Sequence, residues 1–495
     1  MAYNEQIDSI RIPSFQSGIN EYSAEGLIKP YEAVKAYNCN ISEGSLRTFN
    51  APDTKYTTAV AIQSISPYYG TDKSLIIFNA GSSVYSIDSW SATNQKLCSI
   101  NYDNIDYINF EYMGKRVLVG VGADNVPFMY DGTTCRQLKN RRPFYDENTG
   151  ELKGYIDDNG KEHKTEDTIS TYCPKGKFLE LHYDRLWIAG NNTFPDRVYF
   201  STAGVNGADI EDFTIPVADE VEANMHGGFI DVRTYDGSKI IGMKTIFNSV
   251  VIFKEKSAHK VYGSSPSNYQ MVDLFSCNGA IADKSIVVGN NGAYFLNRDG
   301  IYYYDGTNTN LVSYKIKNTI SKMNINYANQ AVGIFANSKY YLAIPTGEST
   351  LNNTLIEFDT INNSFMVYEV GNISNFMEYN HEVYYSDYTK ICKLFGTGKP
   401  KYLYWESPMM DLGSKNARKM SNYIYFRAKG NGKIKFTLKT EKKDKSLEVE
   451  LTDTETLYRK KLKNKGRMFK LIIENVDNSS FELIAPEIML EVAED

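Results

Sequence analysis

The feature that most constrains the fold of this chain is a pattern of short apolar runs separated by turns rich in Gly, Asn and Asp. Residues 285–296 contain two such runs on either side of an Asn-Gly pair, and an Asp-Gly pair at 299–300 then leads into the run 301–304. Asn-Gly and Asp-Gly pairs supply the positive φ angles that tight β-hairpins need. The pattern therefore predicts consecutive antiparallel strands joined by short turns.

The same hairpin pattern repeats through residues 59–398. The tripeptide Tyr-Asp-Gly occurs three times in it, at 130–132, 235–237 and 304–306. Without a polar insertion of about 30 residues, this region provides about 310 residues, which at about 40–50 residues per unit make six to eight blades of a β-propeller. We predict an all-β fold built around such a propeller; one or two β-sandwiches made from the same hairpins are the alternative.

Aromatic residues support a strand-rich fold, because they pack well on half-buried pleated surfaces. The chain of 495 residues has 38 Tyr and 24 Phe, and only residues 31–37 and 315–323 have a helix-like pattern. Tyr302, Tyr303 and Tyr304 are consecutive, so their side chains are expected on alternate faces of a strand. We interpret most tyrosines as packing residues; a stacking surface for carbohydrates or bases is the alternative.

Residues 142–170 interrupt the repeat. Turn signals at 148–150 and 158–160 enclose a short strand, and eight carboxylates lie between Asp146 and Asp167 against three lysines. This pattern predicts a projecting acidic hairpin. It is either a solvated loop or an acidic contact surface.

The two ends of the chain differ from the repeat. Residues 399–495 contain 20 Lys and Arg against 15 Asp and Glu, a local charge of +5 that leaves −11 on the remainder. Alternation of apolar and charged residues predicts a C-terminal antiparallel β-sandwich with its lysines facing solvent; binding to nucleic acid or another anionic surface is the alternative. Residues 1–58 lack periodicity. They are predicted to form an extended N-terminal arm that packs on a neighbouring subunit or closes the propeller ring.

Cysteines and histidines give no sign of a metal or redox site. The closest cysteines are 37 residues apart, without a CxxC pair, which favours reduced, buried thiols. The closest histidines are 19 residues apart, without an HExxH or HxH motif, so a locally encoded zinc site is not supported. These residues are Cys39, Cys98, Cys135, Cys173, Cys277 and Cys392, and His163, His182, His226, His259 and His381.

Motifs for nucleotide binding and nucleophilic catalysis are also missing from the sequence. Pro400 follows a Gly-Lys pair at the place where a phosphate-binding loop needs a hydroxyl residue, and no GxSxG elbow is present. Asp184, Asp196, Asp236 and Asp299 are available as carboxylates, but nothing marks two of them as the kind of pair that glycosidases use. We therefore predict no catalytic, cofactor-binding or metal-ligating residue.

The overall charge is not that of a protein that coats nucleic acid, which is normally basic. Lys and Arg number 54 and Asp and Glu number 60, a formal net charge of −6. The first six residues have no basic segment followed by an apolar one, as a secretory signal would. No apolar run approaches the roughly 18 residues of a membrane-spanning helix. We expect a soluble protein, made in a cytoplasm and not inserted in a membrane.

Several short motifs occur in an order that is shared with a known family. They are Phe15-Gln-Ser-Gly-Ile-Asn20, Tyr31-Glu32, Asn38 and Gly44-Ser-Leu-Arg47 near the start; Asp184-Arg-Leu-Trp-Ile-Ala-Gly190, Pro195-Asp-Arg-Val-Tyr-Phe-Ser201, Asp209-Ile-Glu-Asp-Phe213, Val250-Val-Ile-Phe-Lys254, Gly279-Ala-Ile-Ala-Asp-Lys-Ser285, Gly292-Ala-Tyr-Phe-Leu296 and Asp299-Gly-Ile-Tyr302 in the middle; and Trp405-Glu-Ser-Pro-Met-Met-Asp-Leu-Gly413 and Lys465-Gly-Arg467 near the end. Spread thinly over nearly the whole chain, they resemble the tail nozzle (tail tubular) proteins of short-tailed bacteriophages.

This resemblance implies a structural virion protein without catalytic activity or cofactor, made in the host cytoplasm and located in the phage tail. Proteins of that family form a six-fold ring below the portal and adaptor, and genome DNA passes through the lumen during ejection. The implied partners are further copies of the chain, the adaptor or head–tail connector, tail fibre or tail-end proteins, and DNA that is not bound sequence-specifically. An acidic body would repel DNA phosphates and let the strand pass without sticking.

Two other functions stay open at this point. A propeller can act as a module that binds a glycan or a protein at its central mouth. It can also be a carbohydrate-active enzyme, whose carboxylate pair would have to come from distant parts of the sequence. A ring-shaped oligomer favours the virion protein, tight binding of one ligand by a monomer favours the module, and turnover of a glycan favours the enzyme.

Overall fold

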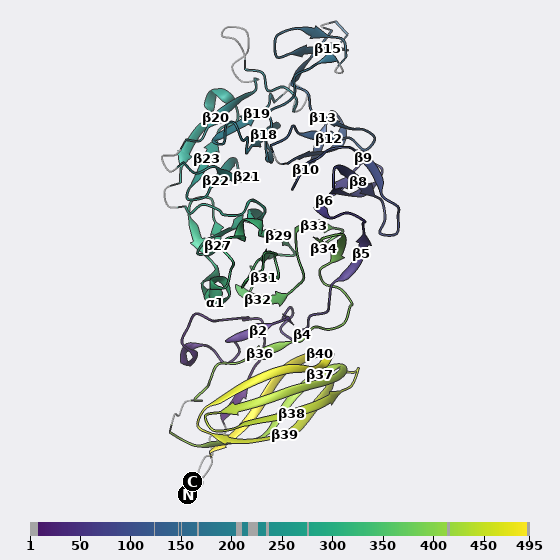
Figure 1. Ribbon diagram of the computed structural model, residues 1–495. Coiled ribbons are helices and arrows are strands. Elements are labelled where there is room, and N and C mark those ends of the chain that lie inside the picture. Colours follow the sequence, from purple (N-terminus) through teal and green to yellow (C-terminus); the bar gives the residue numbers. More distant parts are fainter. Residues whose placement is uncertain are drawn as a thin grey trace.

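Short strands and tight turns build a ring of four-stranded antiparallel sheets in the middle of the molecule (Figure 1). The computed structural model describes residues 8–122, 124–146, 148–149, 151–165, 168–203, 210–215, 226–233, 237–274, 277–412 and 416–492. Seven such sheets occur within these ranges. The structure thus confirms the predicted all-β propeller, and its blade number lies within the expected six to eight.

The seven blades follow one another in chain order, and each begins at the innermost strand. They are β6 (Ile62–Tyr69), β7 (Ser74–Ala80), β8 (Ser83–Ile87) and β9 (Gln95–Cys98); β10 (Asp106–Tyr112), β11 (Lys115–Val121), β12 (Phe128–Tyr130) and β13 (Cys135–Gln137); β17 (Phe178–His182), β18 (Arg185–Ala189), β19 (Arg197–Phe200) and β20 (Gly228–Asp231); β21 (Ile240–Ile246), β22 (Ser249–Lys254), β23 (Ala258–Tyr262) and β24 (Gln270–Asp273); β25 (Val287–Gly289), β26 (Gly292–Asn297), β27 (Gly300–Tyr304) and β28 (Thr309–Leu311); β29 (Val332–Ala336), β30 (Lys339–Ile344), β31 (Thr354–Asp359) and β32 (Ser364–Glu369); and β33 (Asn375–Tyr379), β34 (Glu382–Asp387), β35 (Lys390–Lys393) and β5 (Asp53–Thr57).

The Tyr-Asp-Gly tripeptides serve as turns between the outer strands. Asp305 accepts hydrogen bonds from the backbone N–H groups of Thr307 and Asn308, at 2.8 and 2.7 Å. These hydrogen bonds, led by that of Asn308, lower the pKa of the Asp305 carboxyl. Asp131 is bonded in the same way in the second blade, whereas the copy at 235–237 lies partly outside the described residues.

The last blade closes the ring with a strand from near the start of the chain. β5 pairs antiparallel with β35, with Thr57 opposite Lys390 and Asp53 opposite Lys393. We expected residues 53–57 to belong to the N-terminal arm. In the structure they form the outer strand of the seventh blade, which agrees with ring closure, one of the two roles expected for the arm. Without β5, β35 would be an edge strand with unpaired backbone groups.

Within the residues that the structure describes, helical structure is limited to short segments between strands. They are the 3-10 turns η1 (Glu25–Leu27), η3 (Pro266–Asn268), η4 (Asp283–Ser285), η5 (Ser313–Ile316) and η6 (Ala328–Gln330) and the helix α1 (Lys317–Ser321). The helical structure predicted at 315–323 is therefore confirmed by η5 and α1. The one at 31–37 was wrong, because Lys35–Tyr37 is strand β2, which pairs with β36 (Tyr404–Glu406).

Apolar cores fill the spaces between neighbouring blades. Tyr302 and Tyr304 are buried against the fourth blade, whereas Tyr303, on the opposite face of β27, packs towards the sixth. The expected alternation of these tyrosines is confirmed. A larger core joins the fifth, sixth and seventh blades to both ends of the chain, with Phe15 and Trp405 in edge contact at 5.2 Å.

Both ends of the chain meet in one antiparallel sheet beside the sixth blade, at the bottom of Figure 1. Its nine strands are β1 (Asp8–Arg11), β2, β3 (Cys39–Asn40), β4 (Leu46–Thr48), β36, β37 (Lys419–Thr440), β38 (Asp444–Leu451), β39 (Thr456–Gly466) and β40 (Phe469–Val492). The long strands β37 and β40 run through two layers, so that Phe426 of one layer meets Phe436 of the other at 4.8 Å. The predicted C-terminal sandwich is thus one folded sheet that also includes strands of the arm.

The arm crosses the edge of the sixth blade at Gly18. The backbone N–H of Ile19 donates to the carbonyl of Phe365 at 3.0 Å. Gly18 has φ +64°, and a Cβ there would stand 2.5 Å from the Phe365 carbonyl oxygen. Only glycine permits this approach without strain, which explains its place in the Phe15–Asn20 segment.

The insertion forms a small three-stranded sheet that projects from between the second and third blades, at the end opposite the C-terminal sheet (Figure 1). Its strands are β14 (Arg141–Tyr145), β15 (Leu152–Asp157) and β16 (Glu162–His163). At its base, the guanidinium groups of Arg136 and Arg141 both pair with the fully buried carboxylate of Glu211. This buried charge cluster fixes the insertion to the propeller.

The expectation of six reduced thiols was wrong for one pair. Cys98 at the end of β9 and Cys135 at the start of β13 form a disulfide. Their separation of 37 residues is about one blade, so the outermost strands of two successive blades bring them together. The other four cysteines are free and buried.

Candidate functional site

The inner strands of the seven blades surround a channel on the axis of the propeller. It has a volume of about 690 Å³ and is lined by β6, β10, β17, β21, β25, β29 and β33. A cavity of about 300–1,000 Å³ has the size of a small-ligand site. We therefore take this channel as the candidate functional site.

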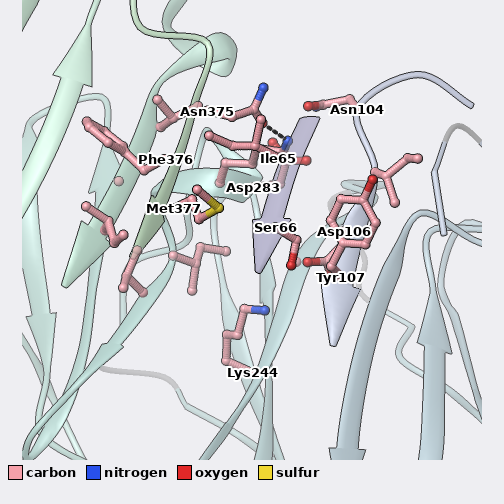
Figure 2. A pocket seen from close by; sticks show the side chains of 18 of the residues that line it. Ile65, Ser66, Asn104, Asp106, Tyr107, Lys244, Asp283, Asn375, Phe376 and Met377 are labelled. Atoms are coloured by element: carbon pink, nitrogen blue, oxygen red, sulfur yellow. Dashed lines mark hydrogen bonds between the residues drawn. The ribbon is translucent and has the colours of Figure 1, made fainter. Parts of the chain in front are cut away.

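Polar side chains from several blades meet in the channel, although they are far apart in the sequence. In Figure 2, Asn375 of β33, beside the apolar Met377, lies opposite Asp106 and Tyr107 of β10, and Lys244 of β21 points into the same space. Each blade contributes its innermost strand to the wall of the channel, and this brings the side chains of different blades together.

Hydrogen bonds between the inner strands link neighbouring blades. The Asp106 carboxylate accepts from the backbone N–H of Leu179 at 3.0 Å. The hydroxyls of Ser64 and Tyr107 lie 3.2 Å apart, and burial raises the pKa of Tyr107. The Asn375 amide donates to the carbonyl of Gln63 at 2.6 Å. Together these contacts connect the seventh, first, second and third blades.

Ion pairs continue the linkage on the other side of the ring. Lys244 of the fourth blade lies 3.6 Å from Glu180 of the third. Burial raises the pKa of Glu180, against the opposing effect of Lys244. Burial also acts to lower the pKa of Lys244, but the negative charges of Asp106 and Glu180 leave it above its usual value. Lys177, just before β17, pairs with Asp283 of the fifth blade at 2.8 Å.

Lys284 is the most unusual group in the channel. It lies in η4, a turn held by the buried Ser285, whose hydroxyl donates to the Ala282 carbonyl at 2.7 Å. The Lys284 ammonium donates to the side-chain oxygen of Asn375, across the channel in the seventh blade. Burial lowers the pKa of Lys284 to about 8, although Asp283 and Asp106 act in the opposite direction.

The network formed by Asp106, Glu180, Lys244, Asp283 and Lys284, named here the channel belt, is engaged in contacts between blades. Each of these five groups has a hydrogen-bond or ion-pair partner on another blade or, for Asp283, on the segment leading into one. A general acid or base must reach a proton of its substrate. The contacts of the channel belt thus link neighbouring blades, and the channel also has other polar side chains and space for a small ligand.

The carboxylates weighed from the sequence are not brought together in this channel. Asp184 and Asp299 lie exposed in hairpin turns, and Asp196 pairs with Lys254 at 2.8 Å. None of the three lines the channel, and Asp236 lies outside the described residues. The structure thus gives no paired-carboxylate arrangement from these described candidates.

Histidines and free cysteines likewise form no metal-binding cluster in the described residues. His163 contacts Asp157 and His259 contacts Asp273, at 2.9 and 2.7 Å. Burial lowers the pKa of His182 to about 4. No three His, Cys, Asp or Glu side chains of the described residues gather in a way that could hold a metal ion.

Comparisons with known proteins give fold likeness only. No family model matches the chain, and no curated protein matches it. Among solved structures, the extracellular domain of a protein described as a hybrid two component system of B. thetaiotaomicron has 10% identity and a TM-score of 0.39, covering 78% of this chain and 45% of that one. The Pan2 WD40 domain of Neurospora crassa has 8% identity and a TM-score of 0.39, with 68% and 90% covered. PorZ of Porphyromonas gingivalis has 11% identity and a TM-score of 0.30, with 82% and 46% covered.

This chain therefore spans less than half the length of the first and third of these structures. At such identities and TM-scores the likeness supports no functional argument. Within the described residues, no helix has the length and apolar character that crossing a membrane requires. The chain is a propeller-fold module, and its function has to be argued from its own surfaces.

Proposed function

We propose that this protein is a non-catalytic structural module that works by binding other macromolecules. The observation that carries the proposal is the channel belt, in which charged groups of the inner strands are used to link blades. A buried ion pair or hydrogen bond between elements favours one arrangement of those elements. We therefore propose that the propeller is rigid and that it binds its partners through its outer surfaces.

The specific form that we propose is a ring-forming component of a phage tail, as the resemblance in the sequence implies. Two features support it. The sixth blade, the N-terminal arm and the C-terminal sheet share one apolar core, so the chain can transmit force as one piece. The insertion and the C-terminal sheet extend from opposite ends (Figure 1), which leaves both available to neighbours.

A DNA conduit in such a ring would lie between subunits and not inside one propeller. The channel has a volume of only about 690 Å³, which is less than that of a cube with the roughly 12 Å width of the B-DNA major groove alone. A duplex does not fit through it. The net charge of −11 on residues 1–398 would keep passing DNA from sticking to a lumen that they form.

Electron microscopy of the purified full chain tests this proposal. We expect closed rings of a single symmetry, since head-to-tail contacts between identical subunits close when the rotation allows it. Particles that stay monomeric at all concentrations, both alone and with purified phage connector, would contradict it. Turnover of a glycan by the purified chain would contradict the non-catalytic part.

A second candidate function is binding of a small polar ligand, such as a glycan end, in the channel. It is favoured by the channel volume and by a lining that includes Ser66, Asn104 and Tyr69. A thermal-shift screen with oligosaccharides tests it. We expect a ligand that raises Tm for the natural chain and fails to do so for Asn104→Leu; a screen without any such ligand would exclude this function for the sugars tested.

A further inference from the structure

The layer that β37 forms with β39 through residues 419–428 carries a group of cations around two tyrosines on its outer surface, with Glu487 of β40 on the other side of Tyr425. We name Tyr423, Tyr425, Arg459, Lys461 and Lys463 the basic face. On β37, Ile424 and Phe426 point into the sandwich, so the two tyrosines between and before them point outwards. Across to β39, the register places Tyr423 opposite Lys461 and Tyr425 opposite Arg459.

Arg459 is held in place on this surface by the tyrosines. Its guanidinium lies 4.1 Å from the ring centre of Tyr423 and 5.7 Å from that of Tyr425. A planar guanidinium over an aromatic ring keeps its donors free for a carboxylate. The centre of the basic face is thus ordered before any partner arrives.

The lysines of the basic face are exposed, and within the described part of the chain Lys461 and Lys463 form no ion pair. β39 pairs only with β37 among the described strands, so it is the edge of its layer. Lysines on an edge strand discourage pairing with another strand. That role does not explain why two tyrosines pack under Arg459. Leu457, 68% exposed on the same face of β39, adds an apolar contact.

The insertion at the other end of the molecule has the complementary character. Tyr145 and Leu152 are cross-strand neighbours and are 46% and 44% exposed. Glu151, next to Leu152, and Glu162 of β16 are exposed and form no ion pair with the described residues. The insertion thus carries the exposed apolar pair on one face and the Glu162 carboxylate, opposite Ile156, on the other, whereas the basic face carries tyrosines and cations together.

We propose that the acidic insertion of one copy of this chain docks on the basic face of a second copy. A contact within one chain is not possible, because the two surfaces lie at opposite ends of the molecule (Figure 1). Opposite charges at the rim of such a contact speed association and fix its register. The Arg136–Glu211–Arg141 cluster holds the insertion stiffly at its base, so little ordering is needed on docking.

The contact is heterologous, since it joins two different surfaces of identical chains. Successive contacts of this kind make a ring or an open filament, depending on the rotation between subunits. The inference rests on the proposed function in that the protein is taken to act in an assembly. It goes beyond it by naming the two surfaces that touch.

Sedimentation velocity of the full chain tests the docking at about 50 mM and about 500 mM salt. We expect association at low salt that weakens at high salt. Lys461→Glu/Lys463→Glu should weaken it at least about tenfold, and so should Glu151→Lys/Glu162→Lys. Mixing the two variants should restore association between them, because the reversed charges attract again. The matched control is Lys73→Glu/Lys96→Glu, an equal change of net charge at exposed lysines of the first blade, which should associate like the natural chain.

Each of the following results would overturn the inference. A natural chain that stays monomeric at low salt would do so, as would association that both charge reversals leave unchanged. Binding of labelled single-stranded DNA that requires Lys461 and Lys463, without a change in self-association, would assign the basic face to nucleic acid instead. Rings that survive both reversals would refute this contact and leave the proposed function standing.

Discussion

The channel of the propeller and the basic face of the C-terminal sheet use charge in opposite ways. In the channel, Glu180 lies beside Lys244 and Lys284 reaches Asn375. On the basic face, Lys461 and Lys463 are without ion pairs in the described residues. The charges in the channel contact neighbouring blades and hold them together, whereas the charges of the basic face remain available to another molecule.

The second layer of the same C-terminal sheet makes this difference sharper. There, Lys433 lies opposite Glu450 on β38, and Lys435 lies opposite Glu448 and pairs with Glu474 at 3.0 Å. Both layers use strand β37, so strand type and lysine content do not explain the basic face. What distinguishes the basic face is that the β37 residues opposite Lys461 and Arg459 are tyrosines and not carboxylates.

The largest effect is expected for the most buried of the paired charges. Glu211→Gln should lower the free energy of unfolding by about 3–5 kcal/mol, because it leaves Arg136 and Arg141 without a buried counter-charge. Urea unfolding of the full chain measures this. Glu455→Gln, at an exposed pair 3.9 Å from Arg427, is the control and should change stability by no more than about 0.5 kcal/mol. Equal losses of stability in both variants would remove the distinction between buried and exposed ion pairs.

Local signals in the sequence predicted the blades well, because each hairpin is encoded within a few residues. Gly292 and Gly300 open strands at positions where φ is +155° and +146°, and the Asp-Gly turns follow the predicted chemistry. The consecutive residues 302–304 also alternate between two cores as expected. These features depend on neighbours along the chain, which a sequence displays directly.

Contacts between distant segments could not be predicted from local pattern. β5 pairs with β35 across more than three hundred residues, and its side chains have no clean alternation of burial. The strands of the arm are completed by β36 and β40 at the far end of the chain. The channel belt is hidden for the same reason: β10, β17 and β21 each contribute one charged residue and η4 contributes two, and only ring closure brings them together.

A smaller effect is expected from the pH dependence of Lys284. Its pKa in the folded chain is about 8, below the ordinary value of 10.5, so between these values the unfolded chain binds more protons than the folded one. Stability from this group therefore rises with pH in that window. Between pH 8 and about pH 9.5, the natural chain should gain about 1–2 kcal/mol relative to Lys284→Met.

Urea unfolding at a series of pH values measures this difference. The comparison with the variant removes the contribution of groups that titrate in both proteins. Asn375→Asp provides a second check, because a carboxylate beside the ammonium would raise the pKa of Lys284 and move the window upwards. A difference that is constant from pH 7 to about pH 9.5 would show that Lys284 is not held as part of the channel belt.

The smallest effect on stability is expected at the basic face, although the effect on association there is large. Lys461→Glu/Lys463→Glu should leave the free energy of unfolding within about 0.5 kcal/mol of the natural value, because exposed charges without a partner contribute little to folding. The same substitutions should abolish most self-association. Thermal unfolding and sedimentation of one preparation measure both quantities. A loss of stability comparable with that of Glu211→Gln would mean that the two lysines hold the sheet together. The basic face would then not differ from the channel in how its charges are used.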